Sequence, residues 1–134
     1  MTVVDASVWV SSLVDKDVHY AASRQWLSRH LADDEGVVIP SICLADVAGA
    51  ISRCTGRSPL GRQAAAEMLL APGVRLVAID AALGQRAADV AASCQLREAD
   101  AVYVAVAQAL ALTLVTWDDE VQSRACTLIA VEHP

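Results

Sequence analysis

The chain has 134 residues and a formal net charge of −6, and 55% of its residues are hydrophobic but only 4% aromatic. A chain of this length buries roughly two-thirds of its unfolded surface, so we expect residues 1–134 to form a single domain. The excess of acidic residues argues against a broad basic surface that binds nucleic acid. Because the chain has no Phe, we expect the core to be built from Ala, Val, Leu and Ile.

Short apolar runs alternate with longer, helix-like segments along the whole chain. Up to residue 70, the pattern predicts in order a strand at 2–4, a helix at 8–14, a helix at 18–32, a polar turn at 33–36, a strand at 37–39, a helix at 41–54, a loop at 55–58 and a helix at 59–70. After a break at 71–73, it predicts a strand at 74–79, helices at 81–94 and 98–110, a strand at 113–115, a helical turn at 121–124 and a last strand at 128–130. Asp5 or Ser7 is expected to cap the first helix, and Ser41 and Asp80 are expected to cap later ones.

This alternation predicts an α/β fold. Buried strands that are joined by helices usually pair in parallel, and the helices then cover both faces of the sheet. We therefore expect a three-layer α/β/α sandwich with a central parallel sheet of four or five strands. The helix at 98–110 is nearly apolar all round, which indicates that it is buried on most sides. Ligands of such folds bind outside the carboxyl ends of the strands.

No segment has the pattern of a targeting signal or of a membrane span. The first ten residues lack the basic region of a signal peptide, and the apolar run 99–115 is interrupted by Asp100 and Gln108. The four cysteines, at positions 43, 54, 94 and 126, include no C-x-x-C pair, which favours buried free thiols in a reducing compartment. We therefore expect a cytoplasmic protein that does not enter a membrane.

Four aspartates lie at strand ends or in the first turns of helices. They are Asp5 after the first strand, Asp46 in the helix after the second, Asp100 in the helix at 98–110, and Asp118 after the fourth strand. Taken singly, each is best explained as a helix cap, a first-turn acid or a solvated side chain. Together at one edge they would repel each other and raise one another's pKa values unless a cation neutralised them. Carboxylate oxygens suit Mg²⁺ or Mn²⁺, with water completing the coordination.

Two hydroxyl residues flank these acids. Ser7 follows Asp5 by two residues, and Thr116 precedes Asp118 by two residues. Such hydroxyls are suited to orienting a ligand or a bound water molecule, and equally to hydrogen bonds at a strand end or a helix cap. Both interpretations stay open.

Three segments carry a more specific pattern: VVDASVWV with Asp5, IPSICLADVAGAISR with Asp46, and LREADAVYVAVAQALALTLVTWDDEV with Asp100, Thr116 and Asp118. In order and spacing they cover nearly the whole chain, which resembles a PIN domain and is most similar to the toxin nucleases of VapBC-type toxin–antitoxin modules. The resemblance implies an endoribonuclease that hydrolyses RNA phosphodiester bonds with Mg²⁺ or Mn²⁺ and is held inactive by a cognate antitoxin.

The resemblance also implies a role for each site residue. The catalytic set is Asp5, Asp46, Asp100 and Asp118, of which Asp5, Asp100 and Asp118 hold one or two metal ions. Ser7 and Thr116 are expected to orient these groups, and Asp119 or Glu120, just after Asp118, is a candidate to compensate for Asp46. The family typically has Glu where this chain has Asp46, whose side chain is shorter by one C–C bond, about 1.5 Å. This departure keeps a second interpretation open: a catalytically weakened or inactive PIN-like module that binds RNA or protein.

Nine of the ten basic residues are arginines, which suit bidentate contact with phosphate. Arg53, Arg57 and Arg62 cluster around one predicted loop and are the candidates for RNA contact, although solvated charges or salt bridges to an antitoxin explain them equally well. The tryptophans, Trp117 among them, are interpreted as packing or interface residues rather than base-stacking platforms. The high apolar content predicts a surface covered by a partner, with a homodimer as the first expectation.

Two other acidic α/β classes fit less well. A response-regulator receiver needs a late lysine, whereas the only lysine of this chain is Lys16. A haloacid-dehalogenase-like phosphatase needs Asp-x-Asp after the first strand, where this chain has Asp5, Ala6 and Ser7.

Overall fold

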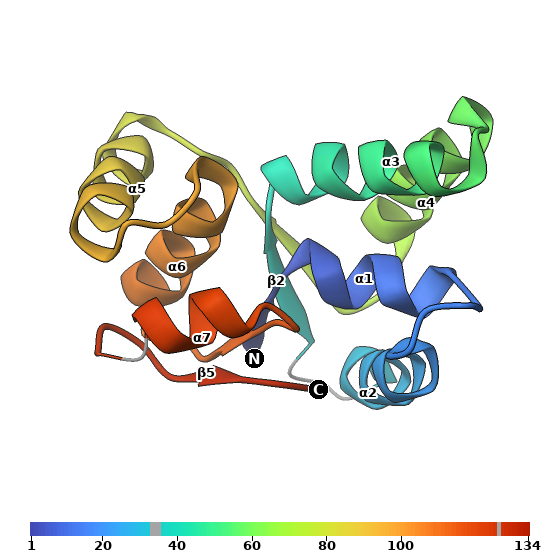
Figure 1. Cartoon of the computed structure of the whole chain (residues 1–134), viewed down its shortest axis with the longest axis horizontal. Helices are drawn as coiled ribbons and strands as arrows, with labels where there is room; N and C mark the ends of the chain where they lie inside the picture. The colour runs from blue at the N-terminus through green and yellow to red at the C-terminus, as the bar shows by residue number, and fades with distance from the viewer. Residues whose placement is uncertain (33–35, 126) are drawn as a thin grey trace.

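Within the residues that the structure describes, which are 1–32, 36–125 and 127–134, five parallel strands form one sheet (Figure 1). The structure is a computed structural model. The strands are β1 (Thr2–Val4), β2 (Val37–Pro40), β3 (Val74–Val77), β4 (Leu114–Val115) and β5 (Val131–Glu132). They lie side by side in the order β3-β2-β1-β4-β5, so β1 is the central strand.

Helices connect the strands and cover the sheet from both sides. The group on the right of Figure 1 consists of α1 (Ala6–Leu13), α2 (Tyr20–Ala32), α3 (Ile42–Thr55) and α4 (Ser58–Leu70). The group on the left contains α5 (Ala81–Cys94) and α6 (Glu98–Leu110), while α7 (Asp119–Ala125) connects β4 to β5. The predicted three-layer α/β/α sandwich with a parallel central sheet is therefore confirmed.

The pairing of β1 with β4 brings two polar residues together at the carboxyl edge of the sheet. Val4 lies opposite Val115, and the backbone N–H of Asp5 donates to the carbonyl of Val115 at 3.0 Å. Because parallel strands run in the same direction, the residues that follow them meet at one edge. Asp5 and Thr116 are therefore neighbours, although they are far apart in the chain.

The helix α6 is the buried helix of the fold. It packs against β1, β2 and β4 on one side and against α5 on the other. Its residues 101 and 103–107 are buried, and its alanines are small enough for close approach to the sheet. The prediction that the helix at 98–110 is buried on most sides is confirmed.

The last strand lies at Val131–Glu132 and not at the predicted 128–130. The amide groups of Leu128 and Ile129 both donate to the carbonyl of Ala125, at 2.9 and 3.2 Å, and close a turn after α7. Pairing with β4 begins only after this turn. The other predicted boundaries agree with the structure to within two residues.

The side chains predicted to cap helices differ in whether they make a capping hydrogen bond. Asp80 caps α5 as predicted, because its Oδ1 accepts the N–H of Leu83 at 2.8 Å. Helix α1 begins at Ala6, and Asp5 occupies its N-cap position without a capping hydrogen bond from its side chain. Ser41 makes no such bond at α3 either. Asp5 and Ser41 thus occupy the predicted N-cap positions, but their side chains do not make the capping hydrogen bond, so the Asp5 carboxylate is available to other partners.

The cysteines differ in burial. Cys43 is buried and Cys94 is half-buried, but Cys54 is exposed, so the expectation of buried thiols is wrong for Cys54. Cys126 and residues 33–35 of the predicted polar turn lie outside the described residues. No helix in the described part of the chain is both long and apolar enough to cross a bilayer.

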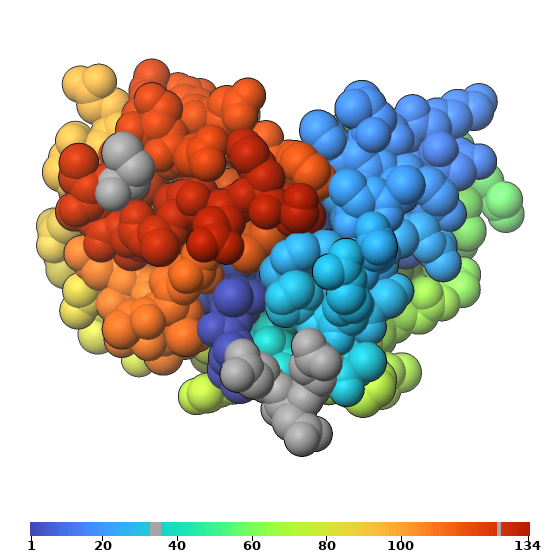
Figure 2. Space-filling view, turned by 90° about the horizontal axis from the view of Figure 1, so that it is seen from below, coloured from blue at the N-terminus to red at the C-terminus, as the bar shows by residue number. Residues whose placement is uncertain are grey.

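The amino terminus lies between two parts of the molecule that are distant in sequence. Seen from below, the first residues (dark blue) lie in a hollow between the C-terminal segment (orange and red) and α2 (cyan) (Figure 2). The central strand itself is buried, because Val3 and Val4 are 0% exposed.

Candidate active site

Acidic side chains from four separate segments line one pocket at the carboxyl edge of the sheet. The pocket has a volume of about 450 Å³. Its acidic lining includes Asp5 after β1, Asp46 in α3, Asp100 in the first turn of α6 and Asp118 before α7. The four aspartates that the sequence singles out therefore share one pocket.

The carboxylate of Asp5 is held by two hydroxyl groups. Its Oδ2 accepts from Ser7 Oγ at 2.6 Å and from Thr116 Oγ1 at 2.7 Å. The same hydroxyl oxygens accept backbone N–H groups, Ser7 from Trp117 at 3.1 Å and Thr116 from Asp118 at 3.0 Å. Both hydrogen bonds described for the Asp5 side chain go to Oδ2, which leaves Oδ1 for a ligand. This geometry favours the interpretation that Ser7 and Thr116 orient a functional carboxylate.

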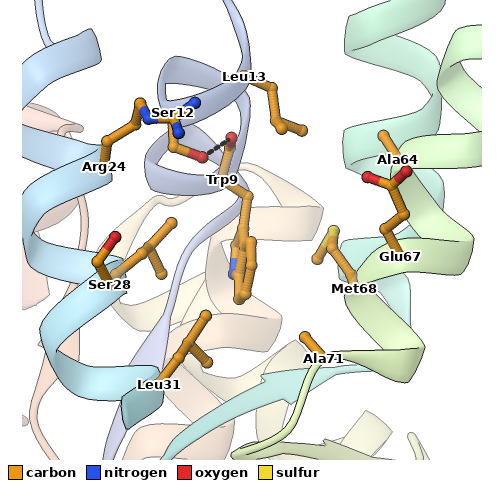
Figure 3. A pocket seen from close by; sticks show the side chains of 11 residues that line it. Trp9, Ser12, Leu13, Arg24, Ser28, Leu31, Ala64, Glu67, Met68 and Ala71 are labelled. Atoms are coloured by element: carbon orange, nitrogen blue, oxygen red, sulfur yellow. Dashed lines mark hydrogen bonds between the residues drawn. The ribbon is translucent and has the colours of Figure 1, made fainter.

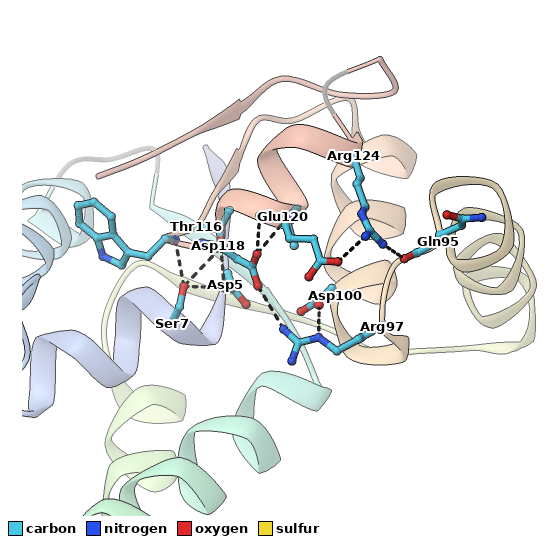
Figure 4. A network of polar contacts seen from close by, with 11 residues as sticks. Asp5, Ser7, Gln95, Arg97, Asp100, Thr116, Asp118, Glu120 and Arg124 are labelled. Atoms are coloured by element: carbon cyan, nitrogen blue, oxygen red, sulfur yellow. Dashed lines mark hydrogen bonds and ion pairs between the residues drawn. The ribbon is translucent and has the colours of Figure 1, made fainter.

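Asp100 and Asp118 both contact the guanidinium group of Arg97 (Figure 4). Arg97 Nε lies 3.1 Å from Asp100 Oδ2, and Arg97 Nη2 lies 3.2 Å from Asp118 Oδ2. Burial raises the pKa of Asp100, Arg97 lowers it, and the charges of Asp118 and Asp5 raise it again, so that the pKa stays above its ordinary value. The charge of Asp100 in turn raises the pKa of Arg97. Two carboxylates thus converge on a single positive charge.

Asp46 is held by a buried tyrosine of α6. Tyr103 is 2% exposed, and its hydroxyl donates to Asp46 Oδ2 at 2.9 Å. Burial raises the pKa of Asp46, and the hydrogen bond from Tyr103 opposes part of this shift. The Tyr103 hydroxyl also contacts the thiol of Cys43, and burial raises the pKa of this thiol to about 12. Cys43 is therefore an uncharged packing group at neutral pH and not a nucleophile.

The side chains do not by themselves enclose an ion, but their chemistry fits one. Among residues 1–32, 36–125 and 127–134, no three His, Cys, Asp or Glu side chains converge closely enough to coordinate one metal ion. Mg²⁺ usually keeps several water molecules and binds proteins through only one or two carboxylates. Asp100 and Asp118 already share a cation, the guanidinium of Arg97, and Asp5 offers a further oxygen in the same pocket. The donor set therefore fits Mg²⁺ or Mn²⁺.

The three arginines proposed for RNA contact are not equivalent. Arg53 lines the acidic pocket, and its charge lowers the pKa of Asp46. Gly49 makes room for it, because a Cβ at this position would lie 3.0 Å from Nη1 of Arg53. Arg57 and Arg62 are exposed and do not line the pocket. Their contact with RNA stays a prediction.

Asp119 does not line the pocket but is connected to it indirectly. Its side chain is 92% exposed and lies 3.3 Å from Nε2 of His133. Nδ1 of His133 lies 2.7 Å from the carbonyl of Thr116, so His133 ties the end of the chain to the loop after β4. Trp117, in this loop, stacks against His19 and His133 with centroid distances of 3.8 and 5.4 Å. These contacts favour the predicted packing role of Trp117 over base stacking.

Sequence reasoning gave no role in the site to Arg97 or Tyr103. Arg97 precedes Asp100 by three residues, a spacing at which opposite charges pair on a helix, so this local signal was sufficient to predict their contact but was not used. The second contact of Arg97, with Asp118, joins segments distant in sequence. The same holds for the contact of Tyr103 with Asp46, so no local signal predicts either of them.

The sequence and the fold match known proteins of one kind. The model of the PIN domain matches residues 2–128. Mycobacterium tuberculosis VapC20, a toxin that cleaves the sarcin–ricin loop, has a TM-score of 0.79 at 18% identity, covering 92% of this chain and 94% of that chain. A toxin–antitoxin complex from Klebsiella pneumoniae has a TM-score of 0.70 at 16% identity, covering 98% and 96%. VapBC2 from Rickettsia felis, bound to a fragment of promoter DNA, has a TM-score of 0.71 at 15% identity, covering 99% and 98%. No curated protein sequence matches the chain significantly.

Proposed function

This chain belongs to the PIN domain family, and from this premise we propose that it is a metal-dependent endoribonuclease, the toxin of a VapBC-type toxin–antitoxin pair. The match over residues 2–128 supports a nuclease, since PIN domains are generally nucleases. The fold shared with VapC20 supports the toxin assignment. The proposed reaction is hydrolysis of a phosphodiester bond of RNA.

The acidic pocket is the observation that carries this proposal. Asp5, Asp100 and Asp118 would hold one or two Mg²⁺ or Mn²⁺ ions, with Asp46 acting directly or through water. When bound, a divalent cation supplies Lewis-acid activation of water and neutralises the charge that develops on the scissile phosphate.

Hydroxyl groups of the protein hold the catalytic carboxylates in position. Ser7 and Thr116 fix the Asp5 carboxylate, and Tyr103 fixes that of Asp46. Arg53 lines the same pocket and has the planar, bidentate geometry that suits a phosphate group. The attacking group is water, so the reaction needs no side-chain nucleophile.

The test is incubation of RNA with and without Mg²⁺ or Mn²⁺, using Asp100→Asn as the variant and Asp89→Asn as its matched control. Asp89 is an exposed acid of α5 that lies outside the pocket. We expect metal-dependent cleavage by the native protein and by the control, and none by Asp100→Asn. Cleavage by Asp100→Asn at the native rate would exclude the assignment.

The Asp100→Asn variant is expected to fold. The pKa of Asp100 lies above its ordinary value in the folded protein, so ionisation of Asp100 lowers the stability of the fold as pH rises through that pKa. An uncharged Asn avoids this loss at neutral pH. Circular dichroism and thermal unfolding of the variant therefore separate a lost activity from a lost fold.

A second candidate function is a PIN-like module that binds RNA or protein with little or no catalysis. Two observations favour it. Asp46 has a short side chain that is hydrogen-bonded to Tyr103, and Asp100 and Asp118 form ion pairs with Arg97. Calorimetric titration with Mn²⁺ alone separates the two candidates. A nuclease binds Mn²⁺ and loses this binding in Asp100→Asn, whereas a degenerate module shows no binding at the acidic pocket.

We also propose that a cognate antitoxin binds the groove between α1, α2 and α4 (Figure 3). The groove has a volume of about 260 Å³, with Trp9, Leu27 and Met68 in its lining and the charged groups of Arg24 and Glu67 on opposite sides. Trp9 is 6% exposed, and its Nε1 has no hydrogen-bond partner among the described residues. The toxin–antitoxin complex from Klebsiella pneumoniae supports a partner of this kind.

Co-expression with a candidate antitoxin tests the groove. Leu13 lines it and is 45% exposed, whereas Leu128 is 38% exposed and lies outside it. Leu13→Asp should abolish co-purification of the antitoxin and Leu128→Asp should not, while both variants retain Mn²⁺ binding. Equal co-purification with both variants would place the antitoxin on another surface.

We propose further that residues 1–134 are one domain, which acts as a homodimer in the cytoplasm. The free cysteines Cys43, Cys54 and Cys94 support a reducing compartment. Leu70 of α4 is 84% exposed and Leu76 of β3 is 42% exposed, which supports an apolar surface that a second copy covers. Sedimentation equilibrium should give twice the monomer mass, and a monomer at micromolar concentration would contradict the dimer.

A further inference from the structure

Asp118 is fixed by the backbone and presents one oxygen to the pocket. Its Oδ1 accepts the N–H groups of Glu120 and Val121, at 2.8 and 3.1 Å. Its Oδ2 is the atom that faces Arg97. The first turn of α6 likewise holds Asp100, so both carboxylates belong to rigid elements. The Asp118 carboxylate is therefore held by the backbone independently of Arg97, whereas the contact described for the Asp100 carboxylate is with Arg97 itself.

The guanidinium of Arg97 is the exposed partner in these two ion pairs. The Arg97 side chain is 71% exposed, whereas those of Asp100 and Asp118 are 18% and 25% exposed. A side chain this exposed leaves its partners for water at little cost, because surface ion pairs are weak. The Arg97 side chain can therefore leave Asp100 and Asp118 without disturbing α6 or the loop after β4.

The charge of the pocket favours such an exchange. Five acidic side chains line it, and its basic side chains are Arg53 and Arg97. One guanidinium shared by Asp100 and Asp118 leaves negative charge in excess. A divalent cation carries twice the charge of a guanidinium group, so it would compete with Arg97 for the carboxylates of Asp100 and Asp118.

We propose that Arg97 is a displaceable counter-ion of the acidic pocket. It neutralises Asp100 and Asp118 while no divalent cation is bound, and it gives up both oxygens when one binds. The released guanidinium then binds a phosphate group of the nucleic acid at the same pocket, which makes Arg97 a positioning residue for the substrate. This inference rests on the proposed nuclease function, because it requires a divalent cation at these carboxylates.

The first test measures Mn²⁺ binding alone by titration calorimetry. Arg97→Gln removes the charge, Arg97→Lys keeps the charge but lacks the fork that reaches both carboxylates, and Arg86→Gln is the control. Arg86 is an exposed arginine that contacts Gln108, away from the pocket. We expect Arg97→Gln to bind Mn²⁺ roughly three- to tenfold more tightly than the native protein, Arg97→Lys to lie between them, and the control to match the native protein. Unchanged or weaker binding by Arg97→Gln overturns the proposal.

The second test measures binding of an RNA oligonucleotide by fluorescence anisotropy in saturating Mn²⁺ at low temperature, and a denaturing gel at the end of each titration checks that the oligonucleotide is intact. We expect Arg97→Gln to bind the oligonucleotide several-fold more weakly than Arg86→Gln, although it holds the metal more tightly. Equal RNA binding by these two variants would remove the phosphate-binding role.

Thermal unfolding without and with Mn²⁺ controls for the fold. Arg97→Gln should unfold at a slightly lower temperature than the native protein without metal, and Mn²⁺ should raise its Tm more than that of the native protein. Tighter Mn²⁺ binding by Arg97→Gln together with no RNA cleavage by the native protein would support the counter-ion role and reject the nuclease. If neither protein binds Mn²⁺, both proposals fail.

Discussion

Replacing Tyr103 by Phe removes one hydroxyl group and keeps the buried ring. The lost hydroxyl donates to Asp46 Oδ2 at 2.9 Å. A hydrogen bond to a charged group contributes about 1.5–3 kcal/mol, but Asp46 is only half-buried, so water replaces part of it and we expect a loss of about 1 kcal/mol. For a chain of 134 residues, this loss lowers Tm by about 3–4 °C.

The loss should depend on pH, because the hydroxyl stabilises the ionised form of Asp46. Burial raises the pKa of Asp46, and the Tyr103 hydrogen bond lowers it. Without the hydroxyl, the pKa of Asp46 in the folded protein rises further, while its pKa in the unfolded chain stays the same. The stability lost in Tyr103→Phe is therefore greatest at pH values where Asp46 is ionised in both the native protein and the variant. The loss becomes smaller as pH falls through the pKa of Asp46 in the folded variant and then through that in the folded native protein.

Thermal unfolding of native and variant protein near pH 7.5 and again near pH 4 measures this dependence. Tyr20→Phe is the matched control, since the Tyr20 hydroxyl accepts from Arg24 on the surface of α2 and has no contact with the pocket. Adding Tyr103→Phe to Asp46→Asn should lower Tm by less than adding it to the native protein. An equal loss at both pH values would mean that the hydroxyl acts through packing and not through Asp46. No loss near pH 7.5 would remove Tyr103 from the site.

Three further substitutions test other parts of the fold and the site. Thr116→Val removes a donor to Asp5 at nearly constant shape, so RNA cleavage should fall roughly 10–100-fold, and a native rate would contradict the role of this hydroxyl. Asp80→Ala removes the cap of α5 and should lower the free energy of unfolding by about 1 kcal/mol in a urea titration, while calorimetry shows unchanged Mn²⁺ binding. Gly61→Ala places a Cβ 2.2 Å from the carbonyl oxygen of Ala48, so α3 and α4 must separate, and urea unfolding should show a loss of about 1–3 kcal/mol. Unchanged stability of Gly61→Ala would mean that the two helices adjust freely.

Local patterns accounted for the order and type of the elements. Apolar runs and helical spacing predicted the alternation of strands and helices, because side-chain burial repeats with the period of each element. Asp80 was predicted as a cap for a similar reason, since its partner, the N–H of Leu83, is only three residues away. The apolar run at 128–130 was wrongly predicted as a strand, because the amide groups of Leu128 and Ile129 form hydrogen bonds in the turn after α7.

The candidate site depended on sequence and tertiary structure in different ways. The types of its residues and their positions at strand ends or early in helices pointed to four aspartates at one edge of the sheet. The sequence left open whether Asp5 caps α1 or faces a ligand, and pairing of β1 with β4 decided this by bringing Thr116 to its carboxylate.

By itself, the sequence determined the α/β class and the acids that end its strands, because both follow from residues that are neighbours in the chain. Only the tertiary structure decided that Arg97 reaches Asp118, that Tyr103 reaches Asp46, and that Arg53 but not Arg57 or Arg62 lines the pocket. The physical reason is that these contacts depend on strand order, strand register and helix packing, which bring together side chains that no local pattern connects.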